Sequence, residues 1–313
     1  RCSHVNWALN SKEYSMLANM FAHYLEMAWK QESQKANFSE IKQFRALMDS
    51  FASLNSTFRL EEFHGMKHQV VFNGQGSWGR NTARCEISDL LIVSYKKTPS
   101  FEARVTLLQA KRSLEKHDLC SSWTSGSCST SFKANLEQWD LLARRPNVLP
   151  YPPFDCHPEI LSGAELPSIG SIGVFHKIKG KEYNFFYMSA DCASPLSNPT
   201  TKYAKLKVHK LKPARMINGY KECTFACCIN TFGEALYNLE IGTPVHDEKG
   251  LSKQSERYRN NLRGWLKMVL MSHIEMTSPD SSLAREFEEL LDTDFEGEFM
   301  HQPPNLILIN CDN

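Results

Sequence analysis

The spacing of apolar residues predicts two helices near the start of the chain. From Ser11 to Gln31, apolar residues recur every three or four positions and form one stripe, the pattern of a helix with one buried face. The stripe includes Leu17, Met20 and Tyr24. Residues 41–54 show a second pattern of this kind, so a helix is expected there as well.

After residue 54 the pattern changes to short apolar runs bounded by turn residues. Such runs are typical of strands, and the second and third of them are separated by only a short loop. The expected strands lie at 68–72, 87–95, 103–111, 171–178, 183–190, 222–230 and 306–309, and further helices are expected at 132–145, 231–240, 257–274 and 283–291. This order predicts an α/β fold with a mixed sheet flanked by helices.

Composition and charge narrow the class of protein. The 313 residues are 42% hydrophobic and 23% charged, with 36 Lys and Arg against 35 Asp and Glu, which argues against a wholly basic nucleic-acid coat protein. No apolar run approaches the ~20 residues of a membrane span. We expect one elaborated domain over residues 1–313, with a core at about 10–145 and C-terminal additions at about 146–313.

Ten cysteines are too few for a disulfide scaffold, and several lie in apolar runs. We interpret them as reduced, buried thiols, and with no signal-peptide pattern in the sequence we expect a cytoplasmic protein.

Chemistry-bearing residues gather on two neighbouring predicted strands. Asp89 precedes Leu-Leu-Ile-Val, and twenty residues later comes Gln109-Ala-Lys111. Side chains alternate across a strand, so Gln109 and Lys111 face one side, where Asp89 can meet them. This set suits phosphodiester hydrolysis: Asp89 would hold Mg²⁺, Gln109 would be a second ligand or orient a water, and Lys111 would position the water or offset phosphate charge.

The Asp89 and Gln109-Ala-Lys111 pattern resembles the PD-(D/E)xK nuclease superfamily, known from restriction endonucleases. The likeness is to its variant branch with Gln-x-Lys, as in Mrr-type enzymes, and it covers about 100 residues, from the first helix to Arg112. The resemblance implies a restriction-endonuclease-like sheet and a Mg²⁺-dependent endonuclease, with Mn²⁺ as a substitute. It favours DNA over RNA as the substrate, and it allows a homodimer.

The loss of the second acid, replaced here by Gln109, supports an alternative. The chain could keep the nuclease fold without catalysis and act as a nucleic-acid-binding or scaffold subunit. A nucleotide hydrolase is a weaker alternative, because the sequence has no Walker pattern.

Two further acids are candidates for the site. The family often supplies an acid from its first helix, and helical spacing places Glu13 in the middle of the apolar stripe, where a carboxylate needs a partner or a metal. The alternative for Glu13 is a place in the first helical turn, near the positive end of the helix. Glu86 would face away from Asp89 in an ideal strand, so it joins the catalytic residues only if the strand bends.

Basic residues are concentrated locally. Residues 202–215 hold six Lys and Arg, no acid, and Tyr203, a composition that suits a phosphate backbone but also a solvated face. Strand alternation would turn Lys205 and Lys207 to solvent. The candidate nucleic-acid-binding residues are Arg112, Lys205, Lys207, Lys210, Arg257, Arg259 and Arg263.

Other motifs are weaker. Gly74-Gln-Gly76-Ser-Trp-Gly79 matches a dinucleotide fingerprint but leads into a strand instead of a helix, which argues against a nucleotide cofactor. A hairpin tip that contacts DNA through Trp78 and Arg80 fits better. Zinc sites at His64 and His68, at Cys120 and Cys128, or at Cys156-His157 lack the further ligands that zinc needs.

Overall fold

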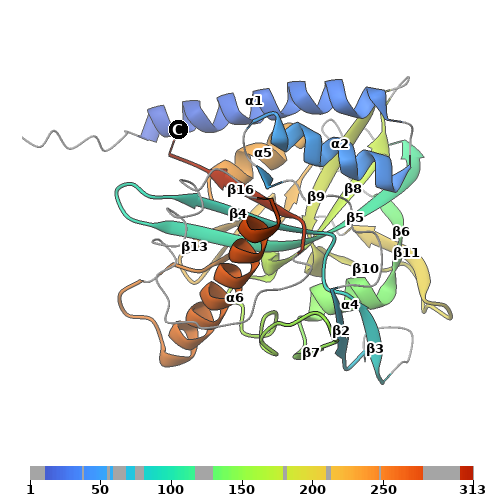
Figure 1. Cartoon of the computed structure of the whole chain (residues 1–313). Helices are drawn as coiled ribbons and strands as arrows, with labels where there is room; N and C mark the ends of the chain where they lie inside the picture. The colour runs from blue at the N-terminus through green and yellow to red at the C-terminus, as the bar shows by residue number, and fades with distance from the viewer. Residues whose placement is uncertain are drawn as a thin grey trace, which may run out of the picture.

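The structure is a computed structural model of the chain. It describes residues 11–36, 39–54, 57–58, 68–74, 81–116, 130–178, 182–208, 213–246, 248–277 and 304–312. These residues form a mixed α/β fold around one large mixed sheet, as predicted (Figure 1).

The large sheet has eight strands in the order β1-β16-β4-β5-β8-β9-β14, and β15 pairs with β5. Its strands are β1 (Thr57–Phe58), β4 (Leu90–Lys96), β5 (Glu102–Lys116), β8 (Gly170–Lys177), β9 (Tyr183–Ser189), β14 (Phe225–Ala226), β15 (Thr243–Pro244) and β16 (Leu306–Asn310). β4 and β5 form an antiparallel hairpin whose register runs from Leu90 opposite Leu108 to Lys96 opposite Glu102. β5 pairs in parallel with β8, and β4 pairs in parallel with β16.

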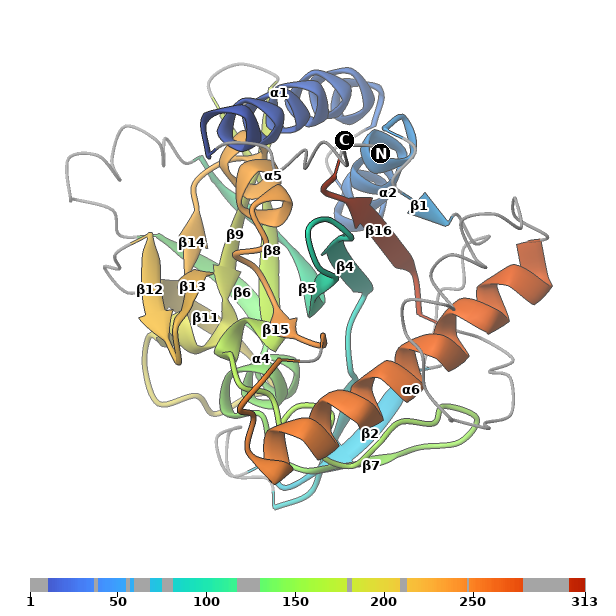
Figure 2. The same ribbon diagram turned by 90° about the vertical axis from the view of Figure 1, so that its left-hand side faces the viewer.

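Three helices cover one face of this sheet: α1 (Ser11–Lys35), α2 (Glu40–Ala52) and α5 (Ile229–Tyr237) (Figure 2). The predicted stripe of α1 is only partly buried: Leu25 is buried, whereas Met20 and Tyr24 are exposed, because the side of the helix that meets the sheet is rotated away from them. Trp29, which the stripe did not include, is buried, and its ring stacks on Phe175 of β8 with centroids 5.7 Å apart. A side chain at Gly233 of α5 would put its Cβ 3.3 Å from Cα of Ala22, so glycine allows the close approach of α5 to α1.

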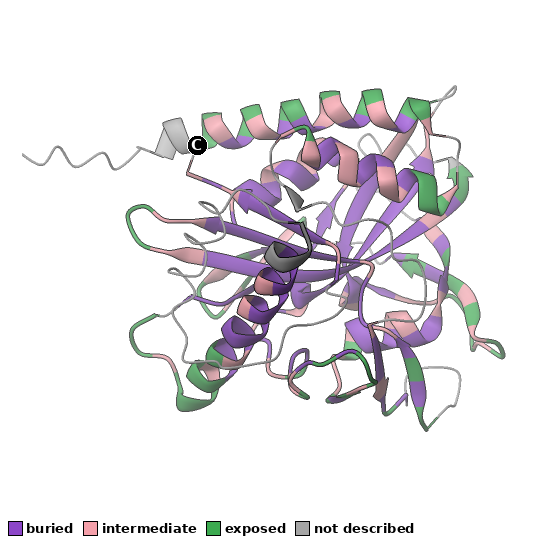
Figure 3. Ribbon diagram, viewed as in Figure 1, coloured by how far each residue is buried: buried purple, intermediate pink, exposed green. Residues whose placement is uncertain are grey.

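The other face carries helices and small sheets. The helices are α4 (Leu136–Arg144) and α6 (Lys253–Thr277), with 3₁₀ turns η1 (Pro167–Ile169) and η2 (Ala190–Cys192). The small sheets have the orders β10-β11-β6, β3-β2-β7 and β12-β13. Their strands are β2 (Gln69–Phe72), β3 (Ala83–Glu86), β6 (Ser131–Asn135), β7 (Val148–Pro150), β10 (Ala193–Pro195), β11 (Tyr203–Val208), β12 (Ala214–Ile217) and β13 (Tyr220–Cys223). With both faces covered, the strands of the large sheet are mostly buried (Figure 3).

In two predicted elements, part of the range has the other type of secondary structure. The helix expected at 132–145 begins at Leu136, because residues 131–135 pair with β11 as strand β6 and the Asn135 side chain caps the helix. The strand expected at 222–230 ends at Ala226, and α5 begins at Ile229. The helix expected at 283–291 lies outside the described residues. Residues after 145 contribute five strands to the large sheet, so the predicted additions share it with the predicted core.

The described cysteines are free thiols. Five of them are buried, as predicted, whereas Cys227 and Cys228 are half-buried. Among the described helices, none has both the length and the apolar character needed to cross a membrane.

Candidate active site

The structure brings together the three residues of the Asp89 and Gln109-Ala-Lys111 pattern. Nζ of Lys111 donates a hydrogen bond to Oε1 of Gln109 at 3.2 Å and lies 3.9 Å from Oδ2 of Asp89. Alternation along β5 turns Gln109 and Lys111 to one side, and Asp89 directly precedes β4 on the neighbouring strand. Gln109 is buried, whereas the Asp89 side chain keeps 27% of its surface exposed. The cluster is therefore anchored in the core and open to solvent on one side.

Asp89 is held where β5 extends past the start of β4. Its backbone N–H donates to the carbonyl of Leu108, and its Oδ2 accepts the N–H of Ala110 at 2.6 Å. The carboxylate thus satisfies a strand N–H that β4 no longer pairs. Lys111 turns back over the same edge, and its Nζ also donates to the Ala110 carbonyl at 2.8 Å.

Glu40 is a fourth member of the cluster and was not among the residues predicted from the sequence. It is the first residue of α2, after the cap Ser39, and its carboxylate accepts a backbone hydrogen bond from Arg112. Asp89 and Glu40 therefore bind the N–H groups of Ala110 and Arg112 along the edge of β5 that extends past β4. The sequence signal that could have identified Glu40 is an acid directly after a capping serine at the start of the second helix. The resemblance to the nuclease superfamily pointed to the first helix instead.

The charges of this cluster act on one another. Glu40 is exposed at the rim, yet partial loss of hydration raises the pKa of its carboxyl. The charge of Lys111 opposes this rise in pKa, and the charge of Asp89 adds to it. The two carboxylates at this edge therefore offer anionic oxygens to a cation, with Lys111 and Arg112 as the nearby positive charges.

Glu86 lies beside the cluster through its backbone. Nε2 of Gln109 donates to the Glu86 carbonyl at 3.3 Å, so the amide of Gln109 is held between Glu86 on one side and Lys111 on the other. The half-buried Glu86 ends β3, which pairs with β2 instead of continuing into β4. The main chain of Glu86 therefore borders the cluster.

Glu13 is not brought to the cluster. Its backbone lies in the first turns of α1, and the helix rises about 33 Å between Glu13 and Lys35. Glu40 follows the other end of that helix (Figure 1). The acid of a helix that lies at the cluster is therefore Glu40 of α2 instead of Glu13 of α1.

The basic residues of α6 do not form the predicted surface. Arg259 is fully buried, with ion pairs to Glu165 at 2.7 and 3.0 Å and a hydrogen bond to the carbonyl of His246 at 2.6 Å. Arg263 is buried too. The prediction that these two contact a nucleic acid is wrong for this reason. Arg257 is exposed and pairs with Glu159 at 2.8 Å.

The basic segment 202–215 is divided between structural and surface roles. Lys202 pairs with the buried Glu137 at 2.6 Å, and Arg215 is held by two carboxylates. In β11, Lys205 and Lys207 face solvent while Leu206 and Val208 are buried, which confirms the predicted alternation. Lys210 lies outside the described residues. Arg112 follows Lys111 in β5 and is half-buried.

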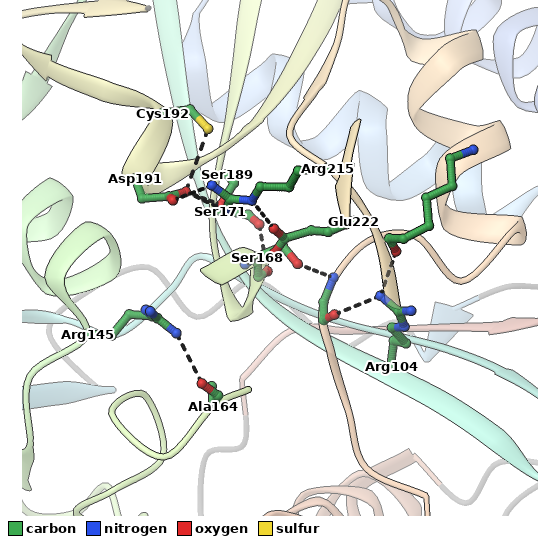
Figure 4. Close-up of polar contacts among 12 residues, drawn as sticks. Arg104, Arg145, Ala164, Ser168, Ser171, Ser189, Asp191, Cys192, Arg215 and Glu222 are labelled. Atoms are coloured by element: carbon green, nitrogen blue, oxygen red, sulfur yellow. Dashed lines mark hydrogen bonds and ion pairs between the residues drawn. The ribbon is translucent and has the colours of Figure 1, made fainter. Parts of the chain in front are cut away.

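A second polar cluster is fully used by the fold. Arg215 donates to Oδ2 of Asp191 at 2.8 Å and also binds Glu222, whose Oε1 accepts the N–H of Ser168 at 2.6 Å (Figure 4). Burial alone would raise the pKa of Asp191, but the hydrogen bonds from Arg215 and Ser189 hold it below its usual value. This cluster joins the β12–β13 hairpin to the large sheet.

The donor set of the candidate site fits a hard cation. Glu40 and Asp89 offer carboxylate oxygens and Gln109 an amide oxygen, and Mg²⁺ is typically bound by one or two carboxylates together with substrate phosphates. In the described part of the chain, no three or more His, Cys, Asp and Glu side chains gather as a metal cage. His64, Cys120, Cys128, Trp78 and Arg80 lie outside the described residues.

No family model, curated protein or solved structure matches this chain. Its function is therefore inferred from the geometry of the site and from the residue pattern.

Proposed function

We propose that the protein is a metal-dependent endonuclease that hydrolyses phosphodiester bonds in DNA. One observation carries the proposal: Asp89, Glu40, Gln109 and Lys111 meet at the edge of β5, and the pKa of Glu40 is raised there. The resemblance of this pattern to the Gln-x-Lys branch of the PD-(D/E)xK nucleases supports the same function, and the mixed α/β fold is compatible with it.

Each side chain has a defined task in this mechanism. Asp89 and Glu40, with the Gln109 oxygen, would hold Mg²⁺ or Mn²⁺, which when bound supplies charge stabilisation for the phosphate. Lys111 has only donors, so its ammonium binds a phosphate oxygen and offsets the negative charge that grows as water attacks phosphorus. One P–O bond breaks, and the products are a phosphate monoester and an alcohol. Gln109 fixes the position of Lys111 through their 3.2 Å hydrogen bond.

The test is cleavage of circular and linear DNA with Mg²⁺, with Mn²⁺ and with EDTA. The wild type should cut circular DNA with either metal and not in EDTA. Asp89→Asn should be inactive, and the matched control Asp155→Asn, at an exposed aspartate, should cut normally. A wild type that binds DNA without cutting it under any of these conditions would contradict the proposal and favour the catalytically inactive, nucleic-acid-binding alternative.

A further inference from the structure

The outward face of β11 combines cations with an aromatic ring. Tyr203, Lys205 and Lys207 alternate to solvent, and Lys133 of β6 stands opposite Lys205 in the strand register. Tyr203 is 56% exposed, and Nζ of Lys133 lies 6.0 Å from the centre of its ring. We call these four residues the β6–β11 face.

Edge protection and ion pairing do not account for all the lysines of this face. Lysines often protect an edge strand from pairing with another chain, and Lys133 lies on the end strand β6, but Lys205 and Lys207 lie on β11, the central strand of the β10-β11-β6 sheet. Within the described residues, Lys133 and Lys207 form no ion pair, whereas Lys205 pairs with Glu115 at 2.9 Å. The face is therefore positively charged and carries an exposed ring, which matches a polyanion with aromatic bases.

The β6–β11 face adjoins the candidate active site. Glu115, the partner of Lys205, follows Lys111 in the same strand by four residues, at most about 14 Å of chain. On the inner side, burial raises the pKa of the Cys85 thiol, and the charges of Lys111 and of the Glu137–Lys202 pair both act on it. Lys111 and Lys202, the residue that precedes Tyr203, therefore both lie near this thiol. One polynucleotide can reach both regions.

We propose that the β6–β11 face binds a single-stranded polynucleotide, with one base stacked on Tyr203 and phosphates on Lys133 and Lys207. A duplex keeps its bases stacked inside, so an exposed ring on an open sheet can meet only an unpaired base. If the single strand is the substrate of the enzyme, this inference rests on the proposed function. Binding of the single strand to the face can be measured without cleavage.

The test is binding of fluorescently labelled oligothymidylate and oligouridylate of about 15 nucleotides, and of a duplex of equal length, in EDTA. The wild type should bind at least one single strand more tightly than the duplex. Tyr203→Ala should weaken single-strand binding roughly 5- to 100-fold, as expected for one lost base stack. Tyr203→Phe should bind like the wild type, because it keeps the ring. The control Tyr24→Ala removes an equally exposed ring from the outside of α1 and should have no effect.

The outcomes separate this inference from the proposed function. If Tyr203→Ala binds a single strand more weakly and the wild type never cuts DNA, the result supports the binding surface and rejects the proposed nuclease function. Normal single-strand binding by Tyr203→Ala, equal losses in the Ala and Phe variants, or a preference for the duplex would overturn the inference even if the wild type cuts DNA.

Discussion

Two clusters in this protein contain the same ingredients, two carboxylates and one cation, and use them differently. In the Arg215 cluster the guanidinium makes direct hydrogen bonds to Asp191 and to the fully buried Glu222, and the pKa of Asp191 is lowered. In the Lys111 cluster the ammonium hydrogen-bonds only neutral oxygens, lies 3.9 Å from Asp89, and leaves the pKa of Glu40 raised. In the first cluster both carboxylates are hydrogen-bonded to the guanidinium. In the second, neither carboxylate is hydrogen-bonded to Lys111, so carboxylate oxygens at this solvent-open edge remain available to a cation.

The largest difference should appear in stability. Arg215→Ala leaves the buried Glu222 charge without its partner, which should lower the free energy of unfolding by about 3 kcal/mol or more. Lys111→Ala should cost clearly less, because Asp89 stays partly hydrated and keeps its hydrogen bond from Ala110. Urea unfolding of both variants makes the comparison, and Arg215→Lys, which keeps the charge, should fall between Arg215→Ala and the wild type. Equal losses for the two alanine variants would remove the distinction between the clusters.

Gln109 should matter for cleavage through its oxygen. Gln109→Ala removes the acceptor of Lys111 and a candidate metal ligand, and should lower the cleavage rate about 10- to 100-fold. Gln109→Glu keeps an oxygen at that position and should retain activity and metal affinity. The measurement is the Mg²⁺ dependence of cleavage for both variants. If they behave alike, Gln109 is not near the metal.

The two clusters should respond to pH with opposite sign. A raised folded-state pKa means that Glu40 binds protons more tightly in the folded chain, so the stability of the wild type relative to Glu40→Gln should fall as pH rises from the ordinary carboxyl range through that raised value. For Asp191 the pKa is lowered, so the stability of the wild type relative to Asp191→Asn should be lost as pH falls below the ordinary range. Chemical unfolding across pH checks both. If the stability contributions of Glu40 and Asp191 change in the same direction with pH, the proposed difference between the two clusters is contradicted.

The smallest effect concerns two lysines of β11. Lys207→Gln should reduce the salt slope of log affinity for a single-stranded polynucleotide by about 0.7, the value for one lost phosphate contact on a single strand. Lys205→Gln should reduce it less, since Glu115 already neutralises Lys205. Titrations at several salt concentrations separate the two, and an unchanged slope for Lys207→Gln would show that β11 does not contact phosphates.

The sequence predicted correctly those features that depend on residues close together in the chain. The hairpin of β4 and β5, and the meeting of Gln109 with Lys111, follow from alternation along one strand. Glu40 could not be found this way, because its approach to Arg112 depends on how α2 packs over the edge of β5. The strand at 131–135 was missed for the same reason, because its partner β11 begins about 70 residues later in the chain.

The spacing of apolar residues in a helix also does not show which of its polar side chains are buried by other parts of the chain. The pattern of α6 shows Arg259 beside its apolar stripe but not that Glu165 and the His246 carbonyl enclose it. The predicted basic surface on α6 therefore failed at Arg259, whereas the predicted exposure of Lys205 and Lys207 on β11 was correct.

The most direct test of the active site is the single-turnover rate of Mg²⁺-dependent DNA cleavage by Lys111→Ala, compared with Lys30→Ala. Lys30 is an exposed lysine paired with Glu26 on α1, so its loss controls for the removal of one positive charge. With both variants folded and bound to substrate, Lys30→Ala should cut at the wild-type rate. Lys111→Ala should cut about 10²- to 10³-fold more slowly, the usual cost of losing one transition-state donor. Equal rates for the two variants would contradict the assignment of Lys111 and of the cluster around it.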